Sequence, residues 1–187
     1  MTSAPSRVFG TGALHGRRAA AEDWLLRSAR DRKTAVAEWT AELGVAVLTA
    51  GISWDVVRMP YAVLDGSFGR DVAPGALLHR LEQLELTGAV FCDPFRPYLY
   101  VMVPAGTDAQ WPRLPALPGV ECLGRTGPCV QHVGVPRLDR TEPPGPYWLR
   151  PPDRTTGRYA DPNRLLKFLR ARAAEPDPEP PAPPSAA

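Results

Sequence analysis

The sequence predicts a single α+β domain, in which helices pack on a mixed or antiparallel sheet. Short apolar runs typical of strands outnumber the helical patterns, and several of them follow one another closely enough to form hairpins. The regular strand–helix–strand alternation that builds a parallel sheet is not sustained. A chain of 187 residues is long enough for one domain with its own core.

The chain is expected to open with an arm and two helices. Residues 1–18 mix Ser, Gly, Thr and Arg without periodicity, which predicts a flexible N-terminal arm. Residues 19–32 carry apolar residues at helical spacing, with acidic residues early and basic residues late, as the helix dipole favours. A second helix is expected over 34–43, with Gly44 as its stop.

A change to strand-like patterns follows the helices. The runs VAVLTAG (45–51) and ISWDVVRMP (52–60) are separated by a tight Ala50–Gly51 turn and are expected to pair as a hairpin. Pro74 then begins the sequence PGALLHRLEQLEL, whose leucines form an apolar stripe at helical spacing.

The second half of the chain is predicted to supply the rest of the sheet. Runs 88–93 and 98–104 are expected to form one hairpin, and runs 119–124 and 128–136 another. PYWLRPP (146–152) is expected to be the last strand.

A helix is predicted to close the domain. Asp161 is expected to cap it and Pro162 to occupy its first position. Its leucines form a core face and its basic residues a solvated face or, alternatively, a phosphate-contacting surface. The folded domain is therefore expected over 19–172. The proline-rich residues 173–187 are predicted to form a disordered tail.

Composition and charge limit the classes of function. The net charge of +2 is too small to indicate a nucleic-acid binder by itself. No stretch approaches the roughly 20 apolar residues of a membrane span, and the N-terminus lacks the apolar segment of a secretory signal. We therefore expect a cytoplasmic protein without a membrane partner. The three cysteines, Cys92, Cys122 and Cys129, are expected to be buried and structural rather than paired.

Asp55 and Glu121 are the candidate chemical residues, because each is a carboxylate within a strand-like apolar run. One interpretation is that Asp55 lies on an edge strand and faces solvent, and that both residues are simply solvated. The other is that they lie on neighbouring strands and share a divalent cation, since hard cations prefer oxygen ligands. Arg58 follows Asp55 by three residues, so strand alternation places it on the opposite face.

Zinc and several common catalytic motifs are not expected. No two histidines have metal-ligand spacing, and there is no Cys-x-x-Cys pair. The sequence also lacks a phosphate-binding glycine loop and a Gly-x-Ser-x-Gly nucleophile motif.

The order of the segments over residues 35–166 resembles the bifunctional DNA primase/polymerase N-terminal domain, a family of the archaeo-eukaryotic primase superfamily. The resemblance is carried by an ordered set of stretches: AEWTAELGVAVLTAGISWDVVRMP, AVFCDPFRPYLYVMVPAG, GVECLGRTGPCVQHVGVP, YWLRPPD and ADPNRLL. It implies a primase–polymerase-like sheet and a connection with nucleotides, DNA and DNA replication.

The resemblance also implies a reduced site. In that family, two acids on a catalytic strand and a third on a later strand hold divalent metal ions against a nucleoside triphosphate. Asp55 matches one acid of the pair and Glu121 the third, but Arg58 stands where the second acid is expected. The nucleotide-contacting histidine that the family would place near 98–102 is absent.

Three functions follow as hypotheses. The first is a degenerate, non-catalytic nucleotide- or nucleic-acid-binding or regulatory protein, with Arg58, Arg96 and Arg125 as phosphate contacts. The second is an active template-directed primase/polymerase that uses Asp55 and Glu121 with Mg²⁺ or Mn²⁺. The third is a protein-interaction module that binds a partner protein through its proline-rich tail. The small number of acids favours the first, and so a protein that is not an enzyme.

Overall fold

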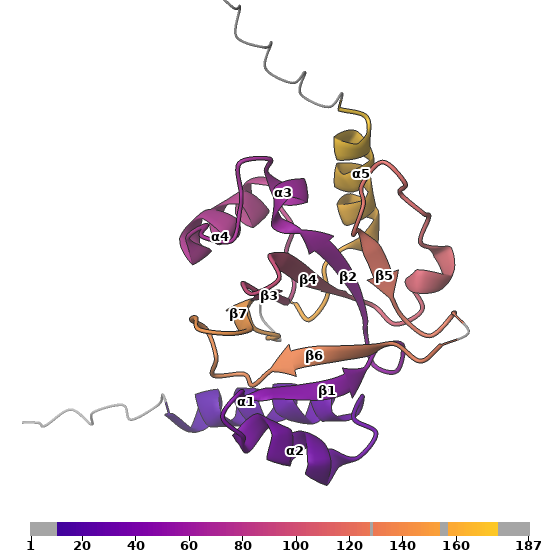
Figure 1. The fold of residues 1–187 in the computed structure, drawn as a ribbon. Helices are drawn as coiled ribbons and strands as arrows, with labels where there is room; N and C mark the ends of the chain where they lie inside the picture. The colour runs from indigo at the N-terminus through magenta and orange to yellow at the C-terminus, as the bar shows by residue number, and fades with distance from the viewer. Residues whose placement is uncertain (1–10, 128, 154–156, 176–187) are drawn as a thin grey trace, which may run out of the picture.

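The computed structural model describes residues 11–127, 129–153 and 157–175 (Figure 1). It confirms an α+β domain with antiparallel sheets. Five strands form one sheet in the order β5-β2-β4-β3-β7, and two strands form a second sheet, β1-β6. The strands are β1 (Val45–Thr49), β2 (Asp55–Pro60), β3 (Val90–Asp93), β4 (Tyr98–Val103), β5 (Glu121–Leu123), β6 (His132–Pro136) and β7 (Tyr147–Arg150).

The helices largely follow the predicted positions. They are α1 (Thr11–Leu26), α2 (Arg32–Thr40), α3 (Tyr61–Leu64), α4 (Pro74–Gln83) and α5 (Pro162–Ala173), with a short 3₁₀ turn at Asp108–Gln110. Asp161 caps α5 as expected, because its carboxylate accepts hydrogen bonds from the main-chain N–H groups of Asn163 and Arg164.

The expected N-terminal arm is partly wrong. Residues 11–18 belong to α1, whereas residues 1–10 lie outside the described part of the chain. The first helix ends at Leu26, earlier than predicted, and Asp31 caps α2 through the main-chain N–H of Thr34. At the other end, α5 extends to Ala173, and residues 176–187 of the predicted tail also lie outside the description.

Two of the three predicted hairpins are wrong. β1 pairs with β6, and β2 pairs with β4 and β5, so the runs on either side of Gly51 belong to different sheets. β5 and β6 are divided between the sheets in the same way. The third hairpin, β3 with β4, is confirmed.

The hairpin predicted for the runs 45–51 and 52–60 does not form because other groups occupy the outer edge of β1. The carboxylate of Glu38 accepts the N–H of Val47 at 2.8 Å, and the carbonyl of Ser28 accepts the N–H of Thr49 at 2.8 Å. The α1–α2 segment therefore takes the edge that a β2 hairpin partner would need, while β6 occupies the other edge.

The five-stranded sheet divides two hydrophobic cores. One core lies between this sheet and the layer of α1, α2, β1 and β6, and includes Trp24, Trp39, Val56 and Trp148. The other lies beneath α3, α4 and α5, and includes Val57, Leu77 and Leu165. In Figure 1, the β1–β6 pair with α1 and α2 is seen on one side of the large sheet, and α3, α4 and α5 on the other.

Buried side chains join the two sheets. The indole N–H of Trp148, on β7, donates to the carbonyl of Pro136, on β6, at 2.9 Å. The Trp148 ring also packs edge-on against Phe91 of β3, with ring centroids 5.1 Å apart.

None of the described helices combines the length and the apolar content that crossing a bilayer requires.

Candidate functional site

A pocket of about 320 Å³ lies where the two sheets meet. The large sheet contributes side chains from β2, β3, β4 and β5, and the small sheet contributes β6 and the start of β1. Its polar lining residues are Arg58, Asp93, Arg96, Tyr100 and His132. Its apolar lining residues include Val45, Phe91, Leu123, Val133 and Pro146.

Arg58 is one of the two arginines that line this pocket. It lies in β2, and its cross-strand neighbours are Tyr100 on β4 and Glu121 on β5. Its guanidinium forms an ion pair with Glu121, with 2.5 Å between Nη2 and Oε1, and lies 4.9 Å from the centre of the Tyr98 ring. The Nε of Arg58 is buried and has no hydrogen-bond partner among the described residues.

The turn between β3 and β4 brings a second arginine to the pocket. The carboxylate of Asp93 accepts the N–H groups of Phe95 at 3.0 Å and Arg96 at 3.5 Å, which fixes the turn. Arg96 itself is exposed, and Phe95 leaves 63% of its surface accessible. The pocket therefore has an ordered carboxylate and an accessible arginine at the β3–β4 turn.

An aromatic pair forms one wall of the pocket. Phe91 and Tyr100 stack with their ring centroids 4.7 Å apart and their planes 2° apart. Burial raises the pKa of Tyr100, while the positive charges of Arg58 and Arg96 act in the opposite direction. The Tyr100 hydroxyl therefore stays protonated at neutral pH and is available to donate a hydrogen bond.

Asp55 lies on the other face of the large sheet. It lies two and four residues before Val57 and Met59, so it shares their face of the strand, which packs on the core beneath α3, α4 and α5. Glu121, in contrast, is the cross-strand neighbour of Arg58. Successive residues of a strand point to opposite faces, so Asp55 and Arg58 face opposite sides, as the spacing predicted. Glu121 lies on the Arg58 side. The structure therefore does not bring Asp55 and Glu121 together, as a shared cation would require.

The expectation that Asp55 lies on a solvent-facing edge strand is also wrong. β2 is flanked by β4 and β5, and the Asp55 side chain is fully buried. Oδ2 accepts the main-chain N–H of Asp108 at 2.9 Å, and Oδ1 has no hydrogen-bond partner among the described residues. Burial raises the pKa of Asp55 to about 6, and the negative charge of Asp108 acts in the same direction.

Asp108 is the residue near Asp55 that the sequence did not reveal. It lies in the 3₁₀ turn, and its carboxylate accepts the N–H of Thr126 at 2.6 Å. Although partial burial acts to raise it, the pKa of Asp108 is lowered, because Thr126 donates hydrogen bonds to the ionised form. No spacing rule connects positions 55 and 108, so only the fold could bring them together.

Arg125, the third predicted phosphate contact, lies outside the pocket. Arg125 is exposed in the turn after β5 and does not line the pocket, since its Cβ packs against Gly51. A Cβ on Gly51 would lie 2.3 Å from that of Arg125, and Gly51 has a φ of +86°, so both contact and conformation require glycine there. Of the three predicted phosphate contacts, the structure brings together Arg58 and Arg96.

The predicted burial of all three cysteines holds only in part. Cys92 is buried, Cys122 is half-buried and Cys129 is exposed, and all three are free. Cys129 is exposed because it follows β5 in the connection to β6, outside both cores.

Among the described residues, no group of three or more His, Cys, Asp or Glu side chains is arranged to hold a metal ion.

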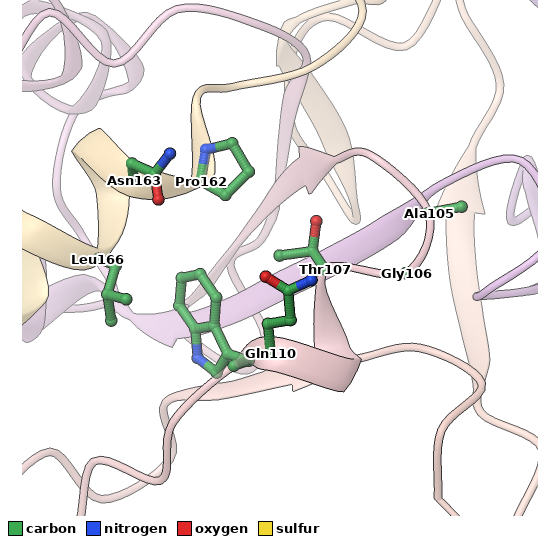
Figure 2. A pocket seen from close by; sticks show the side chains of 8 residues that line it. Ala105, Gly106, Thr107, Gln110, Pro162, Asn163 and Leu166 are labelled. Carbon is green, nitrogen blue, oxygen red and sulfur yellow. The ribbon is translucent and has the colours of Figure 1, made fainter.

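A second pocket of about 290 Å³ lies between the segment after β4 and the start of α5 (Figure 2). Thr107, Gln110 and Asn163 supply its polar side chains, and Leu166 and Pro162 part of its apolar wall. None of its lining residues carries a charge. It therefore offers no counter-charge to a phosphate group, in contrast to the pocket of Arg58 and Arg96.

Comparison with known proteins adds no relative: no family model matches the sequence, and neither the curated proteins nor the solved structures contain a match.

Proposed function

We propose that this chain is a cytoplasmic, primase–polymerase-like domain that binds a nucleotide, free or at the end of a nucleic acid, without polymerising it. The observation that carries the proposal is the pocket between the sheets, where Arg58 and Arg96 line one cavity together with the stacked Phe91 and Tyr100. The kinship that this proposal assumes rests on the order of the sequence stretches over residues 35–166.

The chemistry of the pocket suits a nucleotide. Guanidinium groups present several N–H donors in a plane and pair with phosphate oxygens. The aromatic and aliphatic wall offers an apolar surface to a base or sugar. A volume of about 320 Å³ lies within the usual range of small-molecule sites.

The carboxylates do not suit nucleotide polymerisation. Two-metal phosphoryl transfer requires several carboxylates around the same pair of ions. Glu121 is engaged by Arg58 on one face of the sheet, and Asp55 is buried on the other with Asp108. The described residues therefore do not fit the expected Mg²⁺ or Mn²⁺ site, and we propose binding in place of catalysis.

Calorimetric titration with a deoxynucleoside triphosphate tests this function. We expect saturable binding by the natural chain, and affinity reduced at least about ten-fold by Arg58→Ala and by Arg96→Ala, since charge-assisted hydrogen bonds contribute roughly 1.5–3 kcal/mol. Arg125→Ala is the matched control, because Arg125 is an exposed arginine outside the pocket. Equal affinities in all four proteins, or no binding by the natural chain, would reject the proposal.

A further inference from the structure

Asp93 is the only acidic residue among the described residues that line the pocket between the sheets. Oδ1 of its carboxylate accepts the main-chain N–H groups of Phe95 and Arg96, which hold the β3–β4 turn. Oδ2 accepts no hydrogen bond among the described residues, and the side chain is only partly buried. One carboxylate oxygen is therefore committed to the turn, and the other is left to accept a hydrogen bond from a ligand.

This carboxylate stands beside the aromatic wall of the pocket. Asp93 follows Phe91 by two residues in β3, so the two side chains lie on the same face of the sheet. Burial is the main cause that raises the pKa of Tyr100, the ring stacked on Phe91; the charge of Asp93 adds to it, and Arg58 and Arg96 oppose it. Both signs of charge therefore meet around the wall that would take a base.

An ionised carboxylate accepts hydrogen bonds and donates none, so it discriminates between the bases. The Watson–Crick edge of guanine places two donors side by side, the N1–H and the 2-amino group. Adenine and cytosine each place one amino donor next to a ring nitrogen whose lone pair repels a carboxylate. Thymine places its single N–H between two carbonyl oxygens, which repel it as well. Guanine is thus the base that such an acceptor favours.

We propose that Asp93 is a specificity-determining residue that makes the pocket select guanine nucleotides, because its carboxylate accepts hydrogen bonds from the guanine N1–H and 2-amino groups. The inference rests on the proposed function, since it concerns the same pocket. The two signs of charge have separate tasks: Arg58 and Arg96 pair with the phosphates, and Asp93 reads the edge of the base.

Calorimetric titration of the natural chain with dGTP, dITP and dATP tests the selectivity. These ligands share the same sugar and phosphates and differ only in the base. We expect dGTP to bind at least about ten-fold more tightly than dATP, because hydrogen bonds to a charged acceptor are strong. The hypoxanthine base of dITP keeps the N1–H but lacks the 2-amino group, so its affinity should lie between the two.

Asp93→Asn assigns the selectivity to this carboxylate. The amide oxygen can still accept the two N–H groups of the turn, which leaves the amide NH₂, a donor, in the place of Oδ2. The preference for dGTP over dATP should therefore disappear. Asp65→Asn is the matched control, because Oδ1 of Asp65 likewise accepts the N–H of Ser67 in a turn, but Asp65 lies outside the pocket. It should keep the preference.

The outcomes separate the two proposals. If the natural chain binds dGTP and dATP equally, or if Asp93→Asn keeps the preference, the role of Asp93 is rejected while nucleotide binding stands. The comparison of ligands on the natural chain decides this even if the variant does not fold. If the natural chain binds none of the three triphosphates, nucleotide binding is rejected and the role of Asp93 with it.

Discussion

Asp55 and Glu121 lie on neighbouring strands of one sheet but on opposite faces of it. Asp55 points into the core beneath α3, α4 and α5, and Glu121 meets Arg58 on the side of the small sheet. The sheet itself separates the two carboxylates, so each has its own surroundings: Asp55 is buried beside Asp108, and Glu121 is half-exposed beside Arg58.

The first prediction is that the chain does not extend a primer. Because the two carboxylates cannot bind the same ions, a primer–template with deoxynucleoside triphosphates and Mn²⁺ should give no product above background in a gel assay. Product formation that disappears in both Asp55→Ala and Glu121→Ala would show that the acids act together and would overturn the binding-only function.

The second prediction concerns Asp55 and pH. Its pKa is raised from 3.8 to about 6 on folding, so the unfolded chain loses this proton first. Its contribution is fully present below about pH 4 and is lost as pH rises through 6, by up to about 3 kcal/mol. Asp55→Asn, whose side chain stays neutral, should therefore be more stable than the natural chain at pH 7.5.

Urea unfolding at pH 4.5 and pH 7.5 measures this difference. The gain from Asp55→Asn should be larger at the higher pH, because only there is the natural carboxylate ionised in the folded state. Asp65→Asn is the control, since Asp65 is not buried and its pKa is lowered by hydrogen bonds from Ser67. A gain that is equal at the two pH values would contradict the role of ionisation.

The third prediction concerns Gly124, which leaves room for the Asp108 carboxylate. A Cβ on Gly124 would lie 2.2 Å from the Asp108 carboxyl carbon. Gly124→Ala should therefore push Asp108 away from the N–H of Thr126 and lower the free energy of unfolding by about 1–3 kcal/mol. Gly127→Ala lies in the same connection with nothing within 4 Å and should change stability by less than about 1 kcal/mol.

Chemical denaturation of the two alanine variants provides the comparison. Equal stabilities for Gly124→Ala and Gly127→Ala would mean that the contact between Asp108 and the β5–β6 connection carries no stability.

The fourth prediction concerns the link between the sheets. Trp148→Phe removes the donor to the Pro136 carbonyl, leaves that carbonyl without this partner and reduces buried apolar area. We expect the free energy of unfolding to fall by about 1–3 kcal/mol. Trp111→Phe is the control, because Trp111 is only partly buried and its indole donates no hydrogen bond among the described residues. A larger loss in the control would contradict the importance of this link.

Local chemistry let the sequence predict much of the fold. The proline at the start of α4, the Asp161 cap of α5 and the turn between β3 and β4 act over a few residues, and all three elements lie where the pattern placed them. The α+β class follows from the same local signals.

Pairing over long distances was decided only by the tertiary structure. Glu38 and Ser28 cap the outer edge of β1, which excludes the hairpin that Gly51 suggested locally. The same is true of the site: alternation correctly separated Arg58 from Asp55, because it depends on neighbours in the chain. Strand register decides that Glu121 lies on the same face of the sheet as Arg58, and the path of the loop after β4 decides that Asp108 reaches Asp55. Both are set by packing between segments that are remote in sequence.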